Sequence, residues 1–309
     1  MAADNAGVTN PAIATTGLHK VYGRTVALES LDIRVEPGEV FGFLGPNGAG
    51  KTTAVKLLLG LTRPTGGSGM VLGRPLGDLA TRRRVGYLPE LFRYQAWLTA
   101  REVLALHASL AGIHPARRGP EMDRVLHLVG LDGRGDDRTG GFSKGMQQRL
   151  GLAAALLGDP ALVILDEPTS ALDPVGRDDV RAIIREAQAR GSAVLLNSHL
   201  LGEVERLCDR VAIVHRGRVV AAGALTDLLG QAAVRLRVTD LGALPLDAFG
   251  EVEDDGEGWL VVRGLAEDRV PDLVAAIVAG GGRVHAVDPG RRSLEDLFLD
   301  LVRAPEAVA

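Results

Sequence analysis

The residues best suited to chemistry lie close together in "LGPNGAGKTT", residues 44–53. Residues 45–52 fit the pattern G-x-x-x-x-G-K-[ST], between the apolar stretches "EVFGF" and "AVKLLLGL". Glycines let the backbone wrap a phosphate chain with its N–H groups pointing inward, and the following helix adds a positive dipole end. Lys51 can then reach the β- and γ-phosphates while Thr52 holds Mg²⁺. The alternative, a glycine-rich turn before an ordinary helix, explains neither the lysine nor the flanking runs.

A second candidate element is "LVILDEPTSALD", an apolar run that ends in Asp166 and Glu167. A carboxylate at the tip of a strand suits contact with Mg²⁺, the role expected of Asp166. Glu167, one residue further, is placed to polarise an attacking water. Two adjacent acids at a strand end are otherwise common as solvated loop residues. The phosphate loop makes the catalytic interpretation the stronger one.

Several short segments must position these groups. Continuous apolar runs separated by helical patterns predict a parallel sheet covered on both faces, and the runs are "VFGFL", "LVILD", "AVLLN" and "VAIVH". "LDIRV", residues 31–35, alternates as a half-buried strand should. "HRGRVVAAG", residues 215–223, predicts a hairpin turn and a return strand.

The rest of the chain divides into segments that differ in composition and in hydrophobic pattern. Residues 1–11 are polar and predict a loose tail, followed by an α/β domain over 12–225. Within that domain residues 91–157 predict a helical block, in which Thr99 and Glu102 have capping-box spacing. Residues 226–309 predict a small α+β domain with three strands, the helix "DLVAAIVAGG" and the closing amphipathic "SLEDLFLDLV".

Composition limits the classes of function. The chain has 309 residues, 46% of them apolar, which is enough for a substantial core and for one large or two modest domains. Its net charge of −4 argues against a nucleic-acid binder that relies on a basic field. Cys208 is the only cysteine, so a reducing compartment fits. Neither a signal-peptide pattern nor an uncharged run near the ~20 residues of a membrane span is found. We therefore expect any membrane role to be exercised from outside the lipid.

In chain order, these motifs resemble those of the nucleotide-binding subunit of ATP-binding-cassette (ABC) transporters over residues 12–225. "FSKGMQQR" is similar to the family signature, usually Leu-Ser-Gly-Gly-Gln, and "SALD" is similar to the D-loop. "LLNSH" places His199 where the family has its switch histidine, and Tyr22 in "KVYG" matches the aromatic residue that stacks on adenine. The resemblance implies a P-loop NTPase cassette of the α/β class, in which a mixed sheet core carries an antiparallel β subdomain and an inserted helical subdomain.

The resemblance also implies an ATPase that uses ATP and Mg²⁺, with three groups of site residues. The catalytic residues it implies are Lys51, Glu167 and His199. The metal ligands it implies are Thr52, Glu90 and Asp166. The nucleotide-binding residues it implies are Tyr22, Gly45, Pro46, Asn47, Gly48, Ala49, Gly50, Lys51, Thr52, Thr53, Glu90, Ser143, Lys144, Gly145 and Asp173.

In the family, two such domains associate head to tail and each ATP lies between the phosphate loop of one and the signature of the other. Ser143 and Gly145 open a helix, so a hydroxyl, an N–H group and a helix dipole can meet the partner's γ-phosphate. His199 would hydrogen-bond the γ-phosphate, and Asp173 would organise the dimer seam. Ordinary helix caps by Ser143 and Asp173, and a structural histidine at a strand end, are the alternatives.

Two departures from the family pattern matter. Glu90, in "VGYLPE", stands where the family usually has Gln, a residue that senses the γ-phosphate and Mg²⁺. A carboxylate can still ligand Mg²⁺ but repels phosphate when the metal is absent. A solvated loop acid is the alternative. The signature carries Lys144 and Met146 in place of Gly and Gln, and Lys144 either adds positive charge near the partner's ATP or faces solvent.

"GYLPE", "FSKGMQQR" and the ending "SLEDLF" resemble bacterial ABC-2-type exporters, which move drugs, antibiotics, lipids, polysaccharides or ions outward. The resemblance implies a transmembrane permease partner, a homodimer or heterodimer of nucleotide-binding subunits, and a cytoplasmic position on the inner face of the membrane. We expect the aromatic stretch over 90–99 either to line the groove that grips the permease or to pack within the helical block. Residues 226–309 would brace the dimer, regulate it, or serve only as a packing appendage.

Two other classes of function remain as alternatives. A soluble ABC-type ATPase acting on ribosomes or DNA usually has two cassettes or a large inserted arm, and a basic field. A P-loop kinase has no use for "FSKGMQQR" or "SALD".

Overall fold

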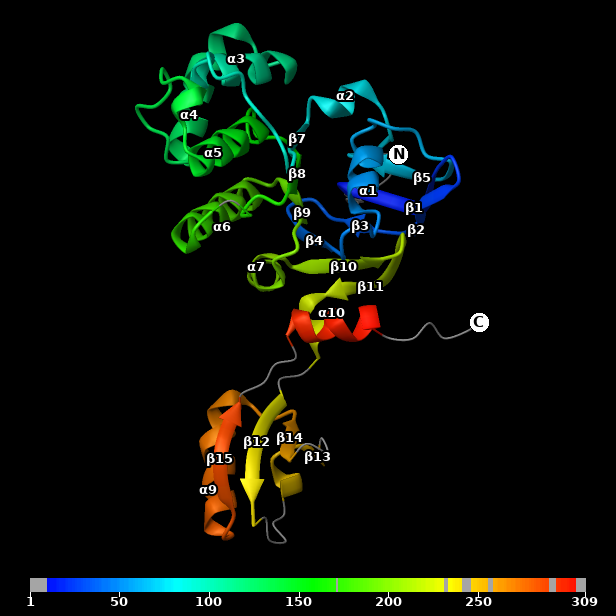
Figure 1. The fold of residues 1–309 in the computed structure, drawn as a ribbon, viewed down its shortest axis with the longest axis vertical. Helices are drawn as coiled ribbons and strands as arrows, with labels where there is room; N and C mark the ends of the chain where they lie inside the picture. The colour runs from blue at the N-terminus through cyan, green and yellow to red at the C-terminus, as the bar shows by residue number, and fades with distance from the viewer. Residues whose placement is uncertain are drawn as a thin grey trace, which may run out of the picture. The chain divides into compact units, whose positions relative to one another are not determined.

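The computed structural model describes residues 10–170, 172–230, 233–240, 246–254, 258–288 and 293–303. The chain forms two compact units that divide after Gly223, and each is described here by itself (Figure 1). Most of the tail predicted over 1–11 lies outside the described residues, and so does Ala171 of "SALD".

The first unit is built on an eleven-stranded sheet, one side of which consists of parallel strands in the order β10-β4-β9-β8-β7. This confirms the parallel sheet predicted from the apolar runs. These strands are β4 (Val40–Leu44), β7 (Val85–Leu88), β8 (Leu162–Asp166), β9 (Ala193–Asn197) and β10 (Arg210–His215). The apolar patterns did not predict β7, because Gly86 interrupts its short run. A Cβ atom at Gly86 would lie 1.8 Å from the carbonyl oxygen of Ala155, so the close approach of a helix requires glycine there.

The other half of this sheet is largely antiparallel, as the family resemblance implied. Its strands are β1 (Ile13–Tyr22), β2 (Thr25–Leu31), β3 (Arg34–Val35), β5 (Gly66–Val71), β6 (Arg74–Pro75) and β11 (Arg218–Ala224). The predicted hairpin turn and return strand are confirmed, because β11 follows β10 and lies next to it in the sheet.

The single strand predicted over residues 31–35 is wrong, although Leu31, Ile33 and Val35 are buried in alternation as expected. The chain leaves β2 after Leu31 and pairs again with β1 only at Arg34. Asp32 lies at the break, where its carboxylate accepts hydrogen bonds from the Gly17 N–H (2.7 Å) and the Ser30 hydroxyl (2.8 Å). These side-chain bonds replace ladder bonds and interrupt the strand.

Helices cover both faces of the parallel strands (Figure 1). Helix α1 (Lys51–Leu58) packs Ala54, Val55, Leu57 and Leu58 into one cluster with Phe41, Phe43, Ile164 and Leu195. The intervening strand residues face the other way, toward α5 (Lys144–Ala155) and α6 (Pro174–Ala189), which contact β7 and β9. A short helix, α7 (Leu201–Leu207), follows β9. The core is almost entirely aliphatic, so the strands are held by packing rather than by buried charge.

A helical block interrupts the sheet between β7 and β8. It contains α3 (Ala100–Leu110), α4 (Pro115–Leu128), the 3₁₀ turn η1 (Thr139–Gly141) and α5, while α2 (Leu79–Arg82) precedes β7. The predicted capping box is confirmed. The Thr99 hydroxyl accepts from the Glu102 N–H at 3.2 Å, and the Thr99 N–H donates to the Glu102 carboxylate at 2.8 Å. Among the described residues, no helix combines the length and the apolar character needed to span a bilayer.

The second unit has its own antiparallel sheet, in the order β13-β14-β12-β15. Its strands are β12 (Ala233–Thr239), β13 (Glu251–Asp254), β14 (Trp259–Arg263) and β15 (Arg283–Asp288), and its helices are α8 (Leu225–Leu229), α9 (Val270–Ala279) and α10 (Leu294–Arg303), with 3₁₀ turns at Leu246–Ala248 and Glu267–Arg269. Leu273 and Ile277 of α9 pack on Val234, Leu236 and Val262 of the sheet. The three strands and two helices predicted here are confirmed, and β13 was not predicted.

Candidate functional site

The phosphate loop joins β4 to α1 at the edge where the parallel strands end. Gly50 is the N-cap residue of α1 with φ of 103°, and a Cβ atom there would lie 2.5 Å from the carbonyl oxygen of Ala27. Only glycine fits this position without strain. The first N–H groups of α1 have no partner within the helix, so the loop places free donors and a positive dipole end at one spot. The geometry can bind an anion.

Lys51 is the first residue of α1, and its side chain folds back over the loop. The Nζ atom donates to the carbonyl oxygens of Gly45 (2.6 Å) and Pro46 (3.2 Å). Burial lowers the pKa of Lys51, while the negative charges of Glu167, Asp166 and Glu90 act in the opposite direction. The ammonium group is therefore held within the loop and surrounded by carboxylates.

Asp166 ends β8 and is 4% exposed. Its Oδ1 atom accepts a hydrogen bond from Asn197 Nδ2 at 2.5 Å. Burial raises the pKa of Asp166, and the Asn197 hydrogen bond opposes that shift, while the charges of Glu90 and Glu167 add to it. Asp166 at the end of β8, Glu167 just after it and Glu90 in the loop after β7 therefore act on one another at the same edge of the sheet.

Glu167 and His199 form a pair at this edge. Glu167 Oε1 accepts from the His199 backbone N–H at 2.9 Å, and Oε2 lies 2.8 Å from His199 Nδ1. Glu167 is 7% exposed, whereas the His199 side chain is 60% exposed. The backbone φ of Glu167 is 54°, a conformation that costs a non-glycine residue about 1–3 kcal/mol. The fold holds this carboxylate in one orientation at some expense in stability.

Mg²⁺ prefers oxygen ligands, and the oxygen-bearing residues near Lys51 fit it. Magnesium is usually held by one or two carboxylates together with substrate phosphates, so a closed protein cage is not required. Thr52 is exposed at the start of α1, Asp166 ends β8, and the charge of exposed Glu90 acts on both Lys51 and Asp166. Within the described ranges, no three acidic, histidine or cysteine side chains form a metal cluster by themselves. The site therefore suits a metal that is shared with a phosphate chain.

The signature residues lie elsewhere, in a groove of about 570 Å³ that also contains Asp173. Ser143 is the N-cap of α5 and accepts from the Met146 N–H at 3.2 Å, and Asp173 is the N-cap of α6 and accepts from the Gly176 N–H at 2.8 Å. Both caps named as alternatives therefore exist, and both capping side chains remain exposed. Gly145 lies in the same groove, and exposed Lys144 follows Ser143.

Two separate clusters of predicted site residues result. In the part of the chain that is described, no hydrogen bond or ion pair joins Ser143, Lys144 or Gly145 to the phosphate loop.

Tyr22, at the end of β1, is 46% exposed, and Lys20 Nζ lies 4.8 Å from its ring centroid. Its ring is thus available to stack on a ligand.

Sequence reasoning missed two buried amides. Gln148, on α5, donates from Nε2 to the Pro168 carbonyl oxygen at 3.0 Å and so ties the signature helix to the loop after Glu167. Asn197 contacts Asp166. The sequence gives no distinguishing signal for Gln148, which stands between Gln147 and Arg149, and the only signal for Asn197 was a polar residue at the end of an apolar run.

The side chains of the aromatic stretch after Glu90 differ in how far they are buried. Phe92 and Tyr94 stack at 5.3 Å between ring centroids, and Tyr94 packs edge-on against His107 of α3. Leu91 and Trp97 are instead 88% and 70% exposed. The packing interpretation therefore holds for Phe92 and Tyr94, whereas Leu91 and Trp97 are exposed and a groove role for them stays a prediction.

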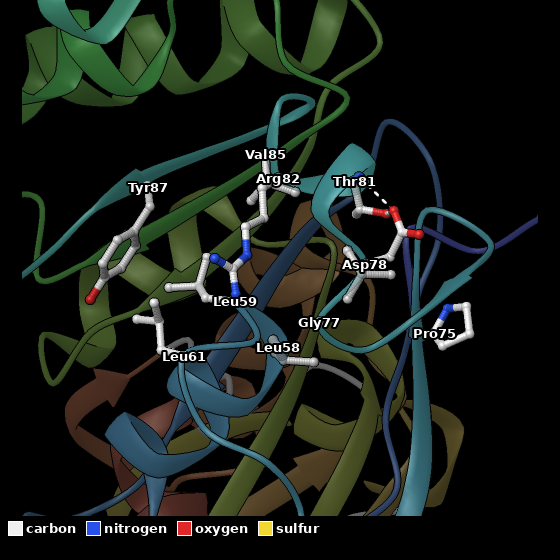
Figure 2. Close-up of a pocket in the computed structure, with 11 residues that line it drawn as sticks. Leu58, Leu59, Leu61, Pro75, Gly77, Asp78, Thr81, Arg82, Val85 and Tyr87 are labelled. Carbon is white, nitrogen blue, oxygen red and sulfur yellow. Dashed lines mark hydrogen bonds between the residues drawn. The ribbon is translucent and has the colours of Figure 1, made fainter. Parts of the chain in front are cut away.

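A small apolar pocket of about 170 Å³ lies between the end of α1, α2 and β7 (Figure 2). Leu58, Leu59 and Leu61 line it together with Tyr87, and Leu61 is 62% exposed. Burial raises the pKa of Tyr87 to about 12, with smaller contributions from the charges of Asp166 and Glu90.

Comparison with known proteins agrees with these motifs. A family model described as "ABC transporter" matches residues 28–170. An uncharacterised ABC transporter ATP-binding protein of Nostoc is 39% identical over 96% of this chain and 91% of its own length. A Nod factor export ATP-binding protein I of Cupriavidus metallidurans is 37% identical over 92% of this chain and 95% of its own length. The bacitracin transport ATP-binding protein BcrA of Bacillus licheniformis is 43% identical over 67% of this chain and 68% of its own length.

Solved structures show the same fold. The ATP-binding subunit of an ABC transporter, 34% identical, superposes with a TM-score of 0.66 over 70% of this chain and 91% of its own. A dimeric ATP-binding cassette bound to ADP and phosphate, 23% identical, has a TM-score of 0.63 over 69% of this chain and 98% of its own, which shows likeness of fold.

Proposed function

We propose that this chain, which belongs to the ABC transporter family of ATP-binding, ATP-hydrolysing subunits, powers a membrane exporter of the ABC-2 type. The observation that carries the proposal is the separation of the two clusters. The phosphate loop and the acids occupy one edge of the sheet, and Ser143, Gly145 and Asp173 occupy a different groove. One chain therefore presents two half-sites, and two chains arranged head to tail complete both.

In this arrangement ATP holds the two nucleotide-binding subunits together. The phosphate loop and Lys51 bind the triphosphate of one subunit, and Tyr22 stacks on its adenine. Ser143, Gly145 and the start of α5 contact the γ-phosphate from the facing subunit. Hydrolysis and loss of phosphate remove that shared contact, and the subunits separate. A subunit of either the same or a related sequence can supply the second half-site.

The acids perform the hydrolytic step. Glu167, oriented by the His199 backbone N–H, accepts a proton from the attacking water, and His199 positions the γ-phosphate. Thr52, Asp166 and Glu90 would hold Mg²⁺. The metal supplies positive charge to the phosphate oxygens, which Lys51 alone cannot balance.

The permease partner contacts the exposed side chains of Leu91 and Trp97. The pocket beside α2, with Leu61 at its rim, offers a socket for an apolar side chain (Figure 2). Tyr87 lines that socket. Relatives are named for bacitracin transport and Nod factor export, and we place this chain in the same role, on the inner face of the membrane.

Replacement of Trp97 with Ala tests the permease contact. An interface tryptophan typically contributes about 2 kcal/mol or more to binding, so the variant should lose most of the permease during affinity purification from detergent-solubilised membranes. Because Trp97 is 70% exposed, ATPase activity and thermal stability of the isolated chain should be retained. Val278→Ala, at an exposed position of the second unit, serves as the control. Permease recovery equal to that of the parent would refute the contact at Trp97, and nucleic acid recovered with the parent in place of a permease would refute the exporter assignment.

Replacement of Glu90 with Gln tests the metal assignment. A carboxylate repels the phosphate chain unless Mg²⁺ lies between them, whereas an amide does not. ATP affinity should therefore depend severalfold more on Mg²⁺ in the parent than in Glu90→Gln. Calorimetric titrations with ATP, in Mg²⁺ and in EDTA, measure the difference. The same dependence in both proteins would show that Glu90 is a solvated loop acid.

A further inference from the structure

Asn197 is a buried polar residue that the hydrolytic scheme leaves without a role. It is 2% exposed and ends β9 directly beside Asp166, its register partner on β8. Its Nδ2 atom donates to Asp166 Oδ1 at 2.5 Å, and its backbone oxygen accepts from the Glu167 N–H at 2.8 Å. One residue thus contacts both acids, through its side chain in one case and through its main chain in the other.

The direction of the amide follows from charge. If the amide were turned over, Asn197 Oδ1 would face the carboxylate, and two acceptors would oppose each other in a site that excludes water. With Nδ2 toward Asp166, one carboxylate oxygen is bound and the other stays available. An amide whose donor faces an acid therefore fixes the rotation of that acid.

The other end of the amide adds a second observation. Asn197 Oδ1 is buried, and no hydrogen-bond donor contacts it among the described residues. A buried acceptor without a donor costs about 1–3 kcal/mol, and it is usually satisfied by an ordered water or a ligand. An apolar side chain, such as those at the preceding positions of β9, would pack here without burying an acceptor that lacks a donor.

We propose that Asn197 is a positioning residue for the metal. It binds Oδ1 of Asp166 and leaves Oδ2 to ligand Mg²⁺, and its own Oδ1 accepts a hydrogen bond from a water of the metal's shell. The inference rests on the proposed function, which places Mg²⁺ at Asp166. Outer-shell partners that orient metal ligands contribute about 10- to 100-fold to metal affinity or activity.

The test is Asn197→Leu, which keeps the branched shape of the side chain but removes the donor to Asp166 and the acceptor Oδ1, while the main-chain bond to Glu167 is retained. ATP affinity is measured by calorimetry with Mg²⁺ varied and again in EDTA, and Mn²⁺ affinity of the nucleotide complex is measured by electron paramagnetic resonance. We expect the Mg²⁺ and Mn²⁺ concentrations needed for tight binding to rise about tenfold or more, while ATP affinity in EDTA is unchanged. Leu196→Val, a buried change at the adjacent position of the same strand, is the control and should alter neither.

Three outcomes decide the matter. An unchanged metal requirement in Asn197→Leu, with the parent clearly metal-dependent, would overturn the role of Asn197. Equal loss of ATP affinity with and without metal would also overturn it, because that result indicates a structural role. Independence of metal in the parent would instead overturn the proposed Mg²⁺ site itself. Should Asn197→Leu fail to fold, Asn197→Ser shortens the side chain, withdraws the amide and has the same expected results.

Discussion

Glu167→Gln should bind ATP with near-normal affinity and lose about 10²- to 10⁴-fold in the rate of hydrolysis, the range expected for removal of a general base. A glutamine Oε1 can still accept the hydrogen bond from the His199 backbone N–H, so the loop should keep its shape. An amide cannot accept a proton from water, and the step therefore fails. Because ATP is no longer consumed, the nucleotide-bound dimer should accumulate.

Two measurements check this expectation. Steady-state phosphate release gives kcat, and sedimentation or light scattering with saturating ATP and Mg²⁺ gives the fraction of dimer. The matched control is Glu186→Gln on α6, a change of the same chemistry at a position paired with Arg190, and it should leave both quantities unaltered. Turnover at the parental rate in Glu167→Gln would remove Glu167 as the group that activates water. A purely monomeric variant, also when tested with a related subunit, would contradict the shared site.

Lys51→Ala should weaken ATP binding itself. Hydrogen bonds between charged groups contribute about 1.5–3 kcal/mol, which corresponds to roughly 10- to 150-fold in Kd. The Nζ atom of Lys51 lies within the phosphate loop, where it donates to the carbonyl oxygens of Gly45 and Pro46, so its removal takes positive charge out of the loop itself. Calorimetric titration with ATP measures the loss. Lys56→Ala, one turn further along α1, is the control and should bind normally.

Mixing two inactive variants distinguishes an ATP site shared by two subunits from one contained within a single subunit. Lys51→Ala removes the phosphate-loop lysine, and Ser143→Arg blocks the signature groove with a bulky side chain. In a head-to-tail dimer of the two, one of the two sites receives an intact phosphate loop and an intact signature. ATPase activity should therefore reappear on mixing, up to about half of the parental level in each mixed dimer. Activity that stays absent, while mixed dimers are shown to form, would refute the head-to-tail arrangement.

Much of the fold and of the site follows from the sequence because it is local. The phosphate loop is contiguous, its glycines and lysine act within ten residues, and its position between a strand and a helix is visible in the apolar pattern. The parallel strands other than β7 were predicted for the same reason, since they are apolar on both faces. The prediction of a single strand over residues 31–35 failed because side-chain hydrogen bonds compete there with strand pairing. The carboxylate of Asp32 accepts hydrogen bonds from the Gly17 N–H and from the Ser30 hydroxyl.

The sequence by itself determined the motifs of an ABC cassette, their chemistry and their order. Tertiary structure alone decided how segments far apart in the chain meet. Asn197 lies 31 residues from Asp166, and only the register of β9 against β8 brings its amide to that carboxylate. Gln148 contacts the loop after Glu167 in the same way. Phe92 and Tyr94 pack against each other, whereas Leu91 and Trp97 are exposed. The signature groove is separate from the phosphate loop. The physical reason is that such contacts depend on which faces pack together, and no short window of sequence contains both partners.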